Sequence, residues 1–344
     1  MPSTSPEPVA APLRQRAQPP RAVRRPEAGL RWAELRPADA PELARLVTRM
    51  ELVDQPPYRT TEAEMAEYFE DSHVVSALGG RDEVGTLRAF GFVRLRRGEV
   101  SLLRAVCSGG VDPVWRRRGV GSALLDWQVD RARQLLVETG LDVPARIVVH
   151  VDENMPDLAG LLERAGFTPR RWYTQMRRDL SLAIPEVVLG PALRLEPWSP
   201  ALDDAARRAH NTAFSDHWGS QPQTAEAWTQ GRTYFAPEWS FVVLDRTTDR
   251  SPVAGYLISA RYEQDWPALG WTEGYTEVMG VLREWRGRHV GSALLAAAMR
   301  AYAADGMQYA GLDVDADNPT GARTLYERLG YEPTHGSTMY SIEI

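Results

Sequence analysis

Two segments of the chain carry nearly the same eleven residues, WRRRGVGSALL at 115–125 and WRGRHVGSALL at 285–295. A second pair of segments, LLERAGFTP at 161–169 and LYERLGYEP at 325–333, recurs after a similar interval. Two matched anchors in the same order indicate an internal duplication. The repeat therefore predicts two domains of one fold, which also suits a length of 344 residues.

The domain boundaries follow from composition. Residues 1–29 are rich in Pro, Ala and Arg without apolar periodicity, which predicts a disordered tail. The proline-rich stretch LAIPEVVLGPALRLEPWSP near 182–200 separates the two repeats. We therefore expect an N-terminal domain over 30–181, a linker over 182–191 and a C-terminal domain over 192–344.

Each half shows the same alternation of patterns. A run with strand character leads through the Arg/Gly turn into apolar residues at helical spacing, and a further strand and a short helix follow. That helix ends at Gly166 or Gly330, where a C-terminal glycine is common. The order β-α-α-β-β-β-α-β-α-β predicts an α/β (α+β) fold, with a mixed sheet and helices on both faces in each domain.

Composition excludes several classes of protein. One cysteine and six scattered histidines allow no intrachain disulfide and no metal-ligand spacing, so we expect no metal. No apolar run is long enough to span a membrane and no secretory leader is present, which favours a cytoplasmic location. The acidic C-terminal half disfavours nucleic acid and weakly favours a cationic partner. A tandem repeat mimics a dimer and so favours a monomer, although the oligomeric state stays open.

The doubled turn has the properties of a phosphate site. A Gly-containing turn before a helix directs several backbone amides to one place, at the positive end of the helix dipole. Arginine adds a permanently charged donor. A dinucleotide fingerprint would need a glycine where Leu124 stands, and a nucleotide P-loop would need a lysine, which the chain lacks. Both alternatives fail on residue identity.

The segments VDPVWRRRGVGSALL (111–125) and VLREWRGRHVGSALL (281–295) resemble the acyl-CoA loop of the GNAT acetyltransferase superfamily. NPTGARTLYERLGY (318–331) resembles its second signature. The similarity covers about 30–344, and the layout resembles that of the tandem mycothiol synthases, in which chemistry is ascribed to the C-terminal half. It implies acetyl-CoA or another acyl-CoA as cofactor, and direct attack of an amine on the thioester. The implied cofactor contacts are Val111, Arg116, Arg117, Arg118, Gly119, Val120, Gly121, Ser122 and Asn154 in the first half, and Val281, Arg286, Gly287, Arg288, His289, Val290, Gly291, Ser292 and Asn318 in the second.

Such chemistry needs a proton source for the departing thiolate, and only one half offers it. Alignment of the repeats pairs Tyr326 with Leu162. A phenol can protonate a thiolate, whereas a leucine cannot. We therefore expect Tyr326 to be the acid of a catalytic C-terminal half, and the N-terminal half to bind cofactor without turning it over.

The base is expected on the strand before the second loop. Period-2 alternation places Glu273, Tyr275, Glu277, Met279 and Val281 on one face unless a bulge intervenes. Glu277 is the first candidate, with Glu273 and Tyr275 as alternatives, and the oxyanion donor is expected to be a backbone amide near Val281. At the position of Gly119 the second loop has His289, which either crowds the phosphate or donates to it.

The acceptor is expected between the first helices and the later strand loops of the C-terminal half. Aromatic walls with a few carboxylates suit a small cationic amine, while a core role for the tryptophans is the competing interpretation. An N-acetyltransferase would act there on an amino sugar, an aminocyclitol conjugate or an antibiotic amine. A non-catalytic acyl-CoA-binding or regulatory protein and a protein N-acetyltransferase are the alternatives. The candidate side chains are His210, Phe214, Asp216, His217, Trp218, Trp228 and Trp239.

Overall fold

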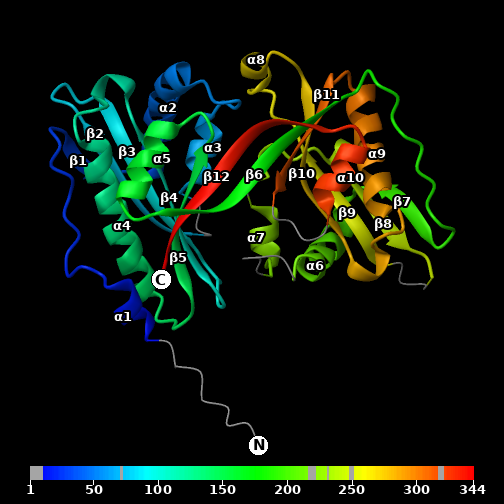
Figure 1. Cartoon of the computed structure of the whole chain (residues 1–344), viewed down its shortest axis with the longest axis horizontal. Helices are drawn as coiled ribbons and strands as arrows, with labels where there is room; N and C mark the ends of the chain where they lie inside the picture. The colour runs from blue at the N-terminus through cyan, green and yellow to red at the C-terminus, as the bar shows by residue number, and fades with distance from the viewer. Residues whose placement is uncertain (1–10, 70–72, 216–221, 231, 248–251, 317–320) are drawn as a thin grey trace, which may run out of the picture.

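The computed structural model describes residues 11–69, 73–215, 222–230, 232–247, 252–316 and 321–344. One mixed sheet of twelve strands runs through both halves, in the order β1-β2-β3-β4-β5-β12-β6-β11-β10-β9-β8-β7 (Figure 1). Helices cover both of its faces, which confirms the expected fold class.

The N-terminal half follows the predicted order of elements. It consists of β1 (Arg31–Glu34), α2 (Ala40–Asp54), α3 (Glu62–Glu67), β2 (His73–Arg81), β3 (Leu87–Arg96), β4 (Leu103–Val111), α4 (Val120–Glu138), β5 (Ala145–Asp152), α5 (Pro156–Arg164) and β6 (Thr168–Asp179). One apolar cluster lies between the sheet and α4, and a second lies under α2 and α3.

The C-terminal half repeats this order with one added short helix. It consists of β7 (Leu193–Pro197), α6 (Asp203–Ala213), α7 (Ala225–Thr229), β8 (Phe241–Asp245), β9 (Val253–Ala260), α8 (Trp266–Leu269), β10 (Glu273–Val281), α9 (Val290–Ala304), β11 (Tyr309–Asp315), α10 (Ala322–Arg328) and β12 (Glu332–Glu343). Its apolar clusters lie under α9 and α10 on one face and under α6 and α7 on the other.

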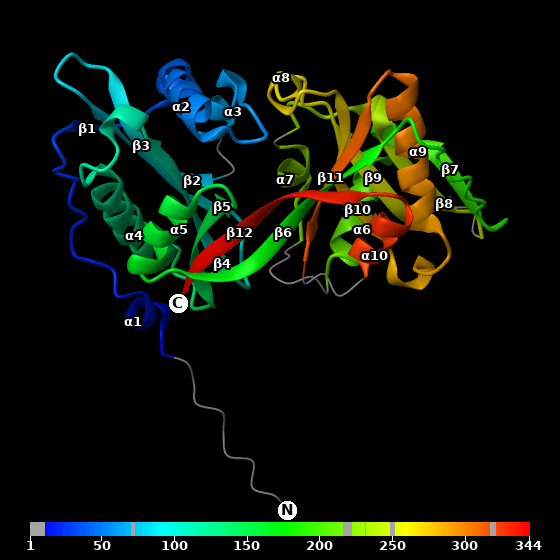
Figure 2. The same ribbon diagram turned by 45° about the horizontal axis from the view of Figure 1, so that its top comes forward.

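The halves exchange their last strands. β6 pairs antiparallel with β11 of the C-terminal half, and β12 pairs antiparallel with β5 of the N-terminal half. β6 and β12 also pair with each other, and Figure 2 shows these two long strands crossing between the halves. The sheet therefore continues from one half into the other, and the domain linker over 182–191 stays a prediction.

Part of the segment expected to be disordered is folded against the N-terminal half. A short helix, α1 (Leu13–Ala17), buries Leu13 and Ala17 in the cluster that includes α4. The Arg16 guanidinium donates to the carbonyl of Ile344 at 2.6 Å and to that of Val143 at 2.9 Å. Two apolar anchors are too few to give a periodic pattern, so for 11–29 the expectation of disorder was wrong. Residues 1–10 lie outside the described residues.

Over the residues that the structure describes, no helix combines the length and apolar character needed to cross a membrane.

Candidate functional site

The loops before α4 and α9 have the same backbone conformation. Each has two residues in the left-handed region, Arg117 (φ 60°) and Gly119 (φ 80°) in one loop, and Gly287 (φ 72°) and His289 (φ 63°) in the other. Each loop thus has one glycine and one larger residue at these positions, in opposite order. A left-handed conformation costs a residue with a side chain roughly 1–2 kcal/mol. Each loop therefore bears this cost at only one of its two left-handed positions, because the other position is a glycine.

The motif arginines brace these loops. Arg116 donates from Nε to the Val111 carbonyl at 3.1 Å, and its two terminal nitrogens lie 2.6 Å from the two carboxylate oxygens of Asp54. Arg286 donates to the Val281 carbonyl at 3.2 Å and to the Ala213 carbonyl at 3.1 Å. Both guanidinium groups therefore tie the loop to the preceding strand and to the end of α2 or α6. The first amides of α4 and α9 lack intrahelical acceptors and remain available to an anion.

Asparagines were expected to contact the cofactor in both halves. Asn154 donates from Nδ2 to the Asp54 carbonyl at 3.1 Å, so it joins the brace around Arg116. Asn318 lies outside the described residues.

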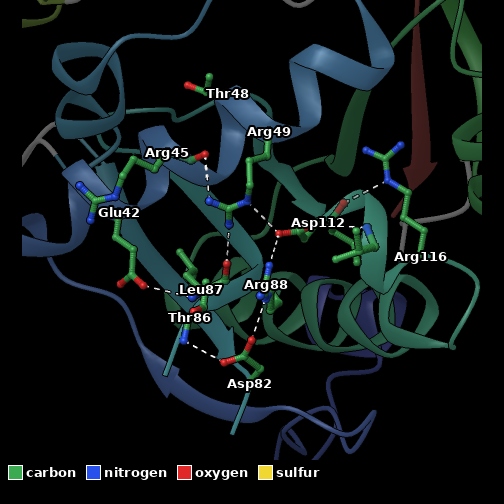
Figure 3. Close-up of polar contacts among 12 residues, drawn as sticks. Glu42, Arg45, Thr48, Arg49, Asp82, Thr86, Leu87, Arg88, Asp112 and Arg116 are labelled. Atoms are coloured by element: carbon green, nitrogen blue, oxygen red, sulfur yellow. Dashed lines mark hydrogen bonds and ion pairs between the residues drawn. The ribbon is translucent and has the colours of Figure 1, made fainter. Parts of the chain in front are cut away.

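A buried ion-pair network holds the start of the N-terminal loop (Figure 3). Asp112, which is 2% exposed, accepts hydrogen bonds from Arg49 and Arg88 at 2.9 Å each. Burial opposes its ionisation, but the hydrogen bonds from Arg88 and Arg49 lower the pKa of Asp112 overall. Arg88 also donates to Asp82 at 2.7 Å. In the C-terminal half the matching residue is Leu282, which packs against the apolar cluster under α6.

The strands on either side of the C-terminal site separate at a bulge. Parallel pairing of β10 with β11 ends at Thr276 and Leu312. The register of β10 against β9 shifts between Thr276 and Val278, which makes Glu277 the extra residue. In the N-terminal half, β4 and β5 separate after Val106 and Val148, and the β3–β4 pairing from Ala105 to Val111 runs without a shift.

The bulge changes which side chains share a face. A Cβ on Gly274 would lie 2.3 Å from Tyr302 of α9, so this residue faces α9. Beyond the bulge, Met279 and Val281 lie on the α9 side, within 4 Å of a Cβ placed on Gly291. Glu273 and Tyr275 therefore face away from α9. The bulge that was named as the exception does intervene, and its extra residue reverses the alternation, so the five residues do not share one face.

A cavity of about 610 Å³ occupies this opening between the strands. It brings together Glu277, Val281, the loop before α9, the start of that helix, and Tyr326 of α10. Glu273, Tyr275 and Arg288 are not among its lining residues. The expected site residues that do line it are Tyr326, Glu277, Val281, Arg286, Gly287, His289, Val290, Gly291 and Ser292.

Tyr326 meets the cavity with a protonated hydroxyl. Burial raises its pKa to about 12, so the phenol keeps its proton at neutral pH. Its ring packs edge-on against Tyr331, with ring centroids 5.9 Å apart. The matching Leu162 has no exposed surface and belongs to the core under α4.

Glu277 is the candidate base that reaches the cavity. The Tyr262 hydroxyl donates to its Oε2 at 2.8 Å. The side chain of Glu277 is exposed in the open cavity, yet the surrounding residues partly desolvate its carboxylate and raise its pKa, and the bond from Tyr262 partly opposes this rise. Glu273 instead is 9% exposed and accepts a hydrogen bond from Trp271 at 2.9 Å, which fixes it in the wall. Tyr262 lies outside the repeated motifs, so no sequence pattern marked it as a site residue.

The N-terminal half contributes to the surroundings of this site. The Thr61 hydroxyl lies 2.6 Å from the Tyr234 hydroxyl, and the Arg59 amide donates to Asp265 at 2.6 Å. Burial raises the pKa of Asp265 to about 7, and nearby carboxylates add to the rise. Burial likewise raises the pKa of Asp313, on the cavity wall, to about 6. The ring of Tyr234 packs against that of Tyr262, the donor to Glu277, with centroids 5.2 Å apart, so the N-terminal half contacts the side chains that support Glu277.

The described residues expected at the acceptor site fall into two groups, those buried in the cores and those that line the cavity. Trp228 and Trp239 are buried and donate to Asp203 and Asp305, at 3.0 Å each. His210 is also buried, with Nδ1 at 2.5 Å from the Tyr256 hydroxyl. The two tryptophans belong to the cores, as the competing interpretation held for the tryptophans. His210 is buried beside Trp228, and Phe214 lines the cavity. Asp216, His217 and Trp218 lie outside the described residues.

Known proteins are similar to this chain in sequence and in architecture. Residues 238–333 match the family model described as an acetyltransferase (GNAT) domain. A mycothiol acetyltransferase of Gordonia bronchialis is 30% identical over 269 residues, covering 75% of this chain and 79% of the relative.

Solved structures extend the likeness of fold to nearly the whole chain. A GCN5-related N-acetyltransferase from Sphaerobacter thermophilus has a TM-score of 0.68 at 22% identity, covering 93% of this chain and 97% of that one. A tandem GNAT protein from the clavulanic acid biosynthesis pathway has a TM-score of 0.68 at 16% identity, covering 91% and 98%. The chain belongs to the GNAT acetyltransferase family and is an acyltransferase that uses acetyl-CoA.

Proposed function

We propose that the C-terminal half, residues 192–344, transfers the acetyl group of acetyl-CoA to a primary amine of a small molecule. The N-terminal half, residues 30–181, holds acetyl-CoA without transferring its acetyl group. The observation that supports the proposal is that one cavity is lined by the loop before α9, by Glu277 and by Tyr326. The N-terminal half has the buried Leu162 in place of the phenol, and its β4 lacks the bulge that carries the carboxylate.

The loop before α9 fits the diphosphate of acetyl-CoA. A Cβ on Gly287 would meet no atom within 4 Å, so the loop leaves room beside its backbone. The amides of Val290, Gly291 and Ser292 begin the helix and would hold the diphosphate. Acetyl-CoA supplies an activated acyl thioester when bound. We assign the same role to Val120, Gly121 and Ser122 at the start of α4.

Glu277 and Tyr326 would move the protons. With Oε2 engaged by Tyr262, the other oxygen of Glu277 is free to take a proton from the amine, directly or through water. The raised pKa makes this carboxylate a stronger base than an ordinary glutamate. Tyr326 would donate its hydroxyl proton to the departing sulfur. The oxyanion role of a backbone amide near Val281 stays a prediction.

The charge around the cavity favours a cationic acceptor. Glu277, Asp313 and Asp315 line it on the strand side. Carboxylates in a concave site attract an ammonium group and raise its local concentration. Because a relative is named a mycothiol acetyltransferase, an aminocyclitol conjugate such as a mycothiol precursor is the first amine to test.

The test measures CoA release by chromatography across a mycothiol precursor, amino sugars, antibiotic amines and a lysine peptide. We expect turnover with at least one small amine. Gly291→Val should abolish it, because even a Cβ there lies 3.2 Å from Leu325 and a larger side chain enters the cofactor cleft. The matched Gly121→Val should keep it. The proposal would be contradicted if none of the small amines gave CoA release, or if only the lysine peptide did.

A further inference from the structure

A second cavity, of about 310 Å³, lies on the sheet of the N-terminal half. It shares one lining residue, Asp315, with the cavity described above. Among the described residues that line it, guanidinium groups outnumber carboxylates two to one; they are Arg94, Arg96, Arg104 and Arg146 against Glu99 and Asp315.

This basic cavity occupies the place that the acidic wall occupies in the C-terminal half. Allowing for the extra bulge residue, Arg104 takes the position of Glu273, and His150 takes that of Asp313. Arg104 lies between Leu103 and Ala105, which face the core under α4, so its side chain is on the opposite face. Glu273 likewise faces away from α9. Arg104 and Glu273 therefore have opposite charges at matching positions, whereas burial lowers the pKa of His150, so a neutral imidazole takes the place of the Asp313 carboxylate.

The guanidinium groups of this cavity have different partners among the described residues, and Arg146 lies 3.5 Å from Glu343. Glu99 holds Arg104 with bonds of 2.8 and 2.5 Å, and Arg96 donates to Gln223 at 2.9 Å. Arg94 stacks over the ring of Tyr68 at 3.9 Å, and its buried Nε has no hydrogen-bond partner in the described part of the chain. A buried donor left without an acceptor costs about 1–3 kcal/mol.

The charges of the cavity also favour binding of an anion. Burial lowers the pKa of Arg96, and the charge of Arg104 lowers it further, against the opposing effect of Glu99. Burial and then the charges of Arg94 and Arg96 lower the pKa of His73 to about 4, so this imidazole is neutral at pH 7. The charged groups disfavour one another's cationic forms, and a bound anion would offset that repulsion.

We propose that the basic cavity binds a small anion of two or more charges, either a phosphate ester or a polycarboxylate. Guanidinium groups donate paired hydrogen bonds to both kinds of anion. The ligand would lie beside the acetyl-transfer cavity, near their shared residue Asp315. This site is separate from the acetyl-CoA and amine sites and goes beyond the proposed function.

The test is calorimetric titration of the full chain with inorganic phosphate and, separately, with citrate. Acetyl-CoA is kept at saturation, so that phosphate does not bind at the cofactor loops, and the buffer contains little salt. We expect one site per chain for at least one of the two anions. Arg94→Gln and Arg104→Gln should each weaken it about tenfold or more, the effect of losing a charged hydrogen bond. Arg45→Gln, at an exposed position of α2, should bind as the wild type does.

The outcomes separate the two ligand sources. Tighter binding of phosphate assigns a phosphate ester, and tighter binding of citrate assigns a polycarboxylate. The proposal is overturned if the wild type binds neither anion saturably, or if Arg94→Gln binds with wild-type affinity. Two variants are used because Arg104→Gln leaves Glu99 buried without its partner, and melting curves show whether each variant is folded. Acetyl transfer is measured on the same samples, so failure of the proposed function is distinguished from failure of this site.

Discussion

The two halves keep the same loop backbone but hold it by different means. In the N-terminal half the buried Asp112 joins Arg49 and Arg88 in an ion-pair network, whereas the matching Leu282 packs into an apolar cluster. A polar and an apolar anchor thus support the same turn. The difference teaches that the two repeats share the path of the backbone, and that each half supports this path with side chains suited to its own surroundings.

The surroundings of the loops differ in chemistry. The C-terminal cavity has the hydroxyl of Tyr326 and the carboxylate of Glu277, while the N-terminal half has Leu162 in its core and no bulge. If both loops hold acetyl-CoA, these few residues decide which half transfers the acetyl group. The predictions below alter them in order of expected effect.

Replacement of the phenol should have the largest effect. Tyr326→Phe should lower kcat about 10- to 1000-fold, the scale of losing one acid–base group, with little change in acetyl-CoA affinity. Steady-state kinetics and calorimetry measure the two quantities. Tyr331→Phe is the matched control, because Tyr331 packs on Tyr326 but its buried hydroxyl has no hydrogen-bond partner among the described residues. Wild-type kcat in Tyr326→Phe would show that Tyr326 is not the acid. The main proposed difference between the two halves would then fail.

The bulge residue should have the next effect. Glu277→Gln should lower kcat/KM about 10- to 100-fold at neutral pH, since the amide cannot accept the amine proton. The base must be ionised, so wild-type activity should fall as the pH drops through the pKa of Glu277. Partial desolvation raises that pKa, so the fall should come at a higher pH than for an ordinary glutamate. The variant should lack this limb of the pH profile.

Glu273→Gln is the control for that experiment. Its carboxylate is held by Trp271 and lies outside the cavity lining, so we expect near wild-type kcat/KM and an unchanged acid limb. The opposite result, with Glu273→Gln inactive and Glu277→Gln active, would transfer the role of base to the buried wall residue.

Much of the fold could be predicted because its signals are local. The strand and helix periodicities, the repeated turns and the closing glycines each act within a few residues. The exchange of β6 and β12 leaves no such mark, since a strand has the same alternation whether it pairs with its own half or with the other. The helix α1 was missed for a related reason, because only Leu13 and Ala17 are buried.

The candidate site shows the same contrast between residues that a local sequence pattern marks and residues that it does not. The phenol of Tyr326 and the carboxylate of Glu277 were predicted because they occur within or beside the repeated segments. Tyr262, which donates to Glu277, and the contact between Arg59 and Asp265 come from segments that the repeat does not mark. The buried Trp228 shows the limit of composition, since an aromatic side chain suits a core and an acceptor pocket equally well.

Exchange of residues between the two loops should have the smallest effect and tests the backbone comparison directly. Gly287→Arg places a second larger residue at a left-handed position, so it should lower the free energy of unfolding by about 1–2 kcal/mol. Adding His289→Gly reproduces the order of the N-terminal loop and should restore most of the loss, as urea denaturation would measure. A double variant as unstable as Gly287→Arg alone would show that the two positions do not compensate.

His289→Gly alone separates the two alternatives for that imidazole, with acetyl-CoA affinity measured by calorimetry. Tighter acetyl-CoA binding means that the ring crowds the diphosphate, and weaker binding means that the ring donates a hydrogen bond to it.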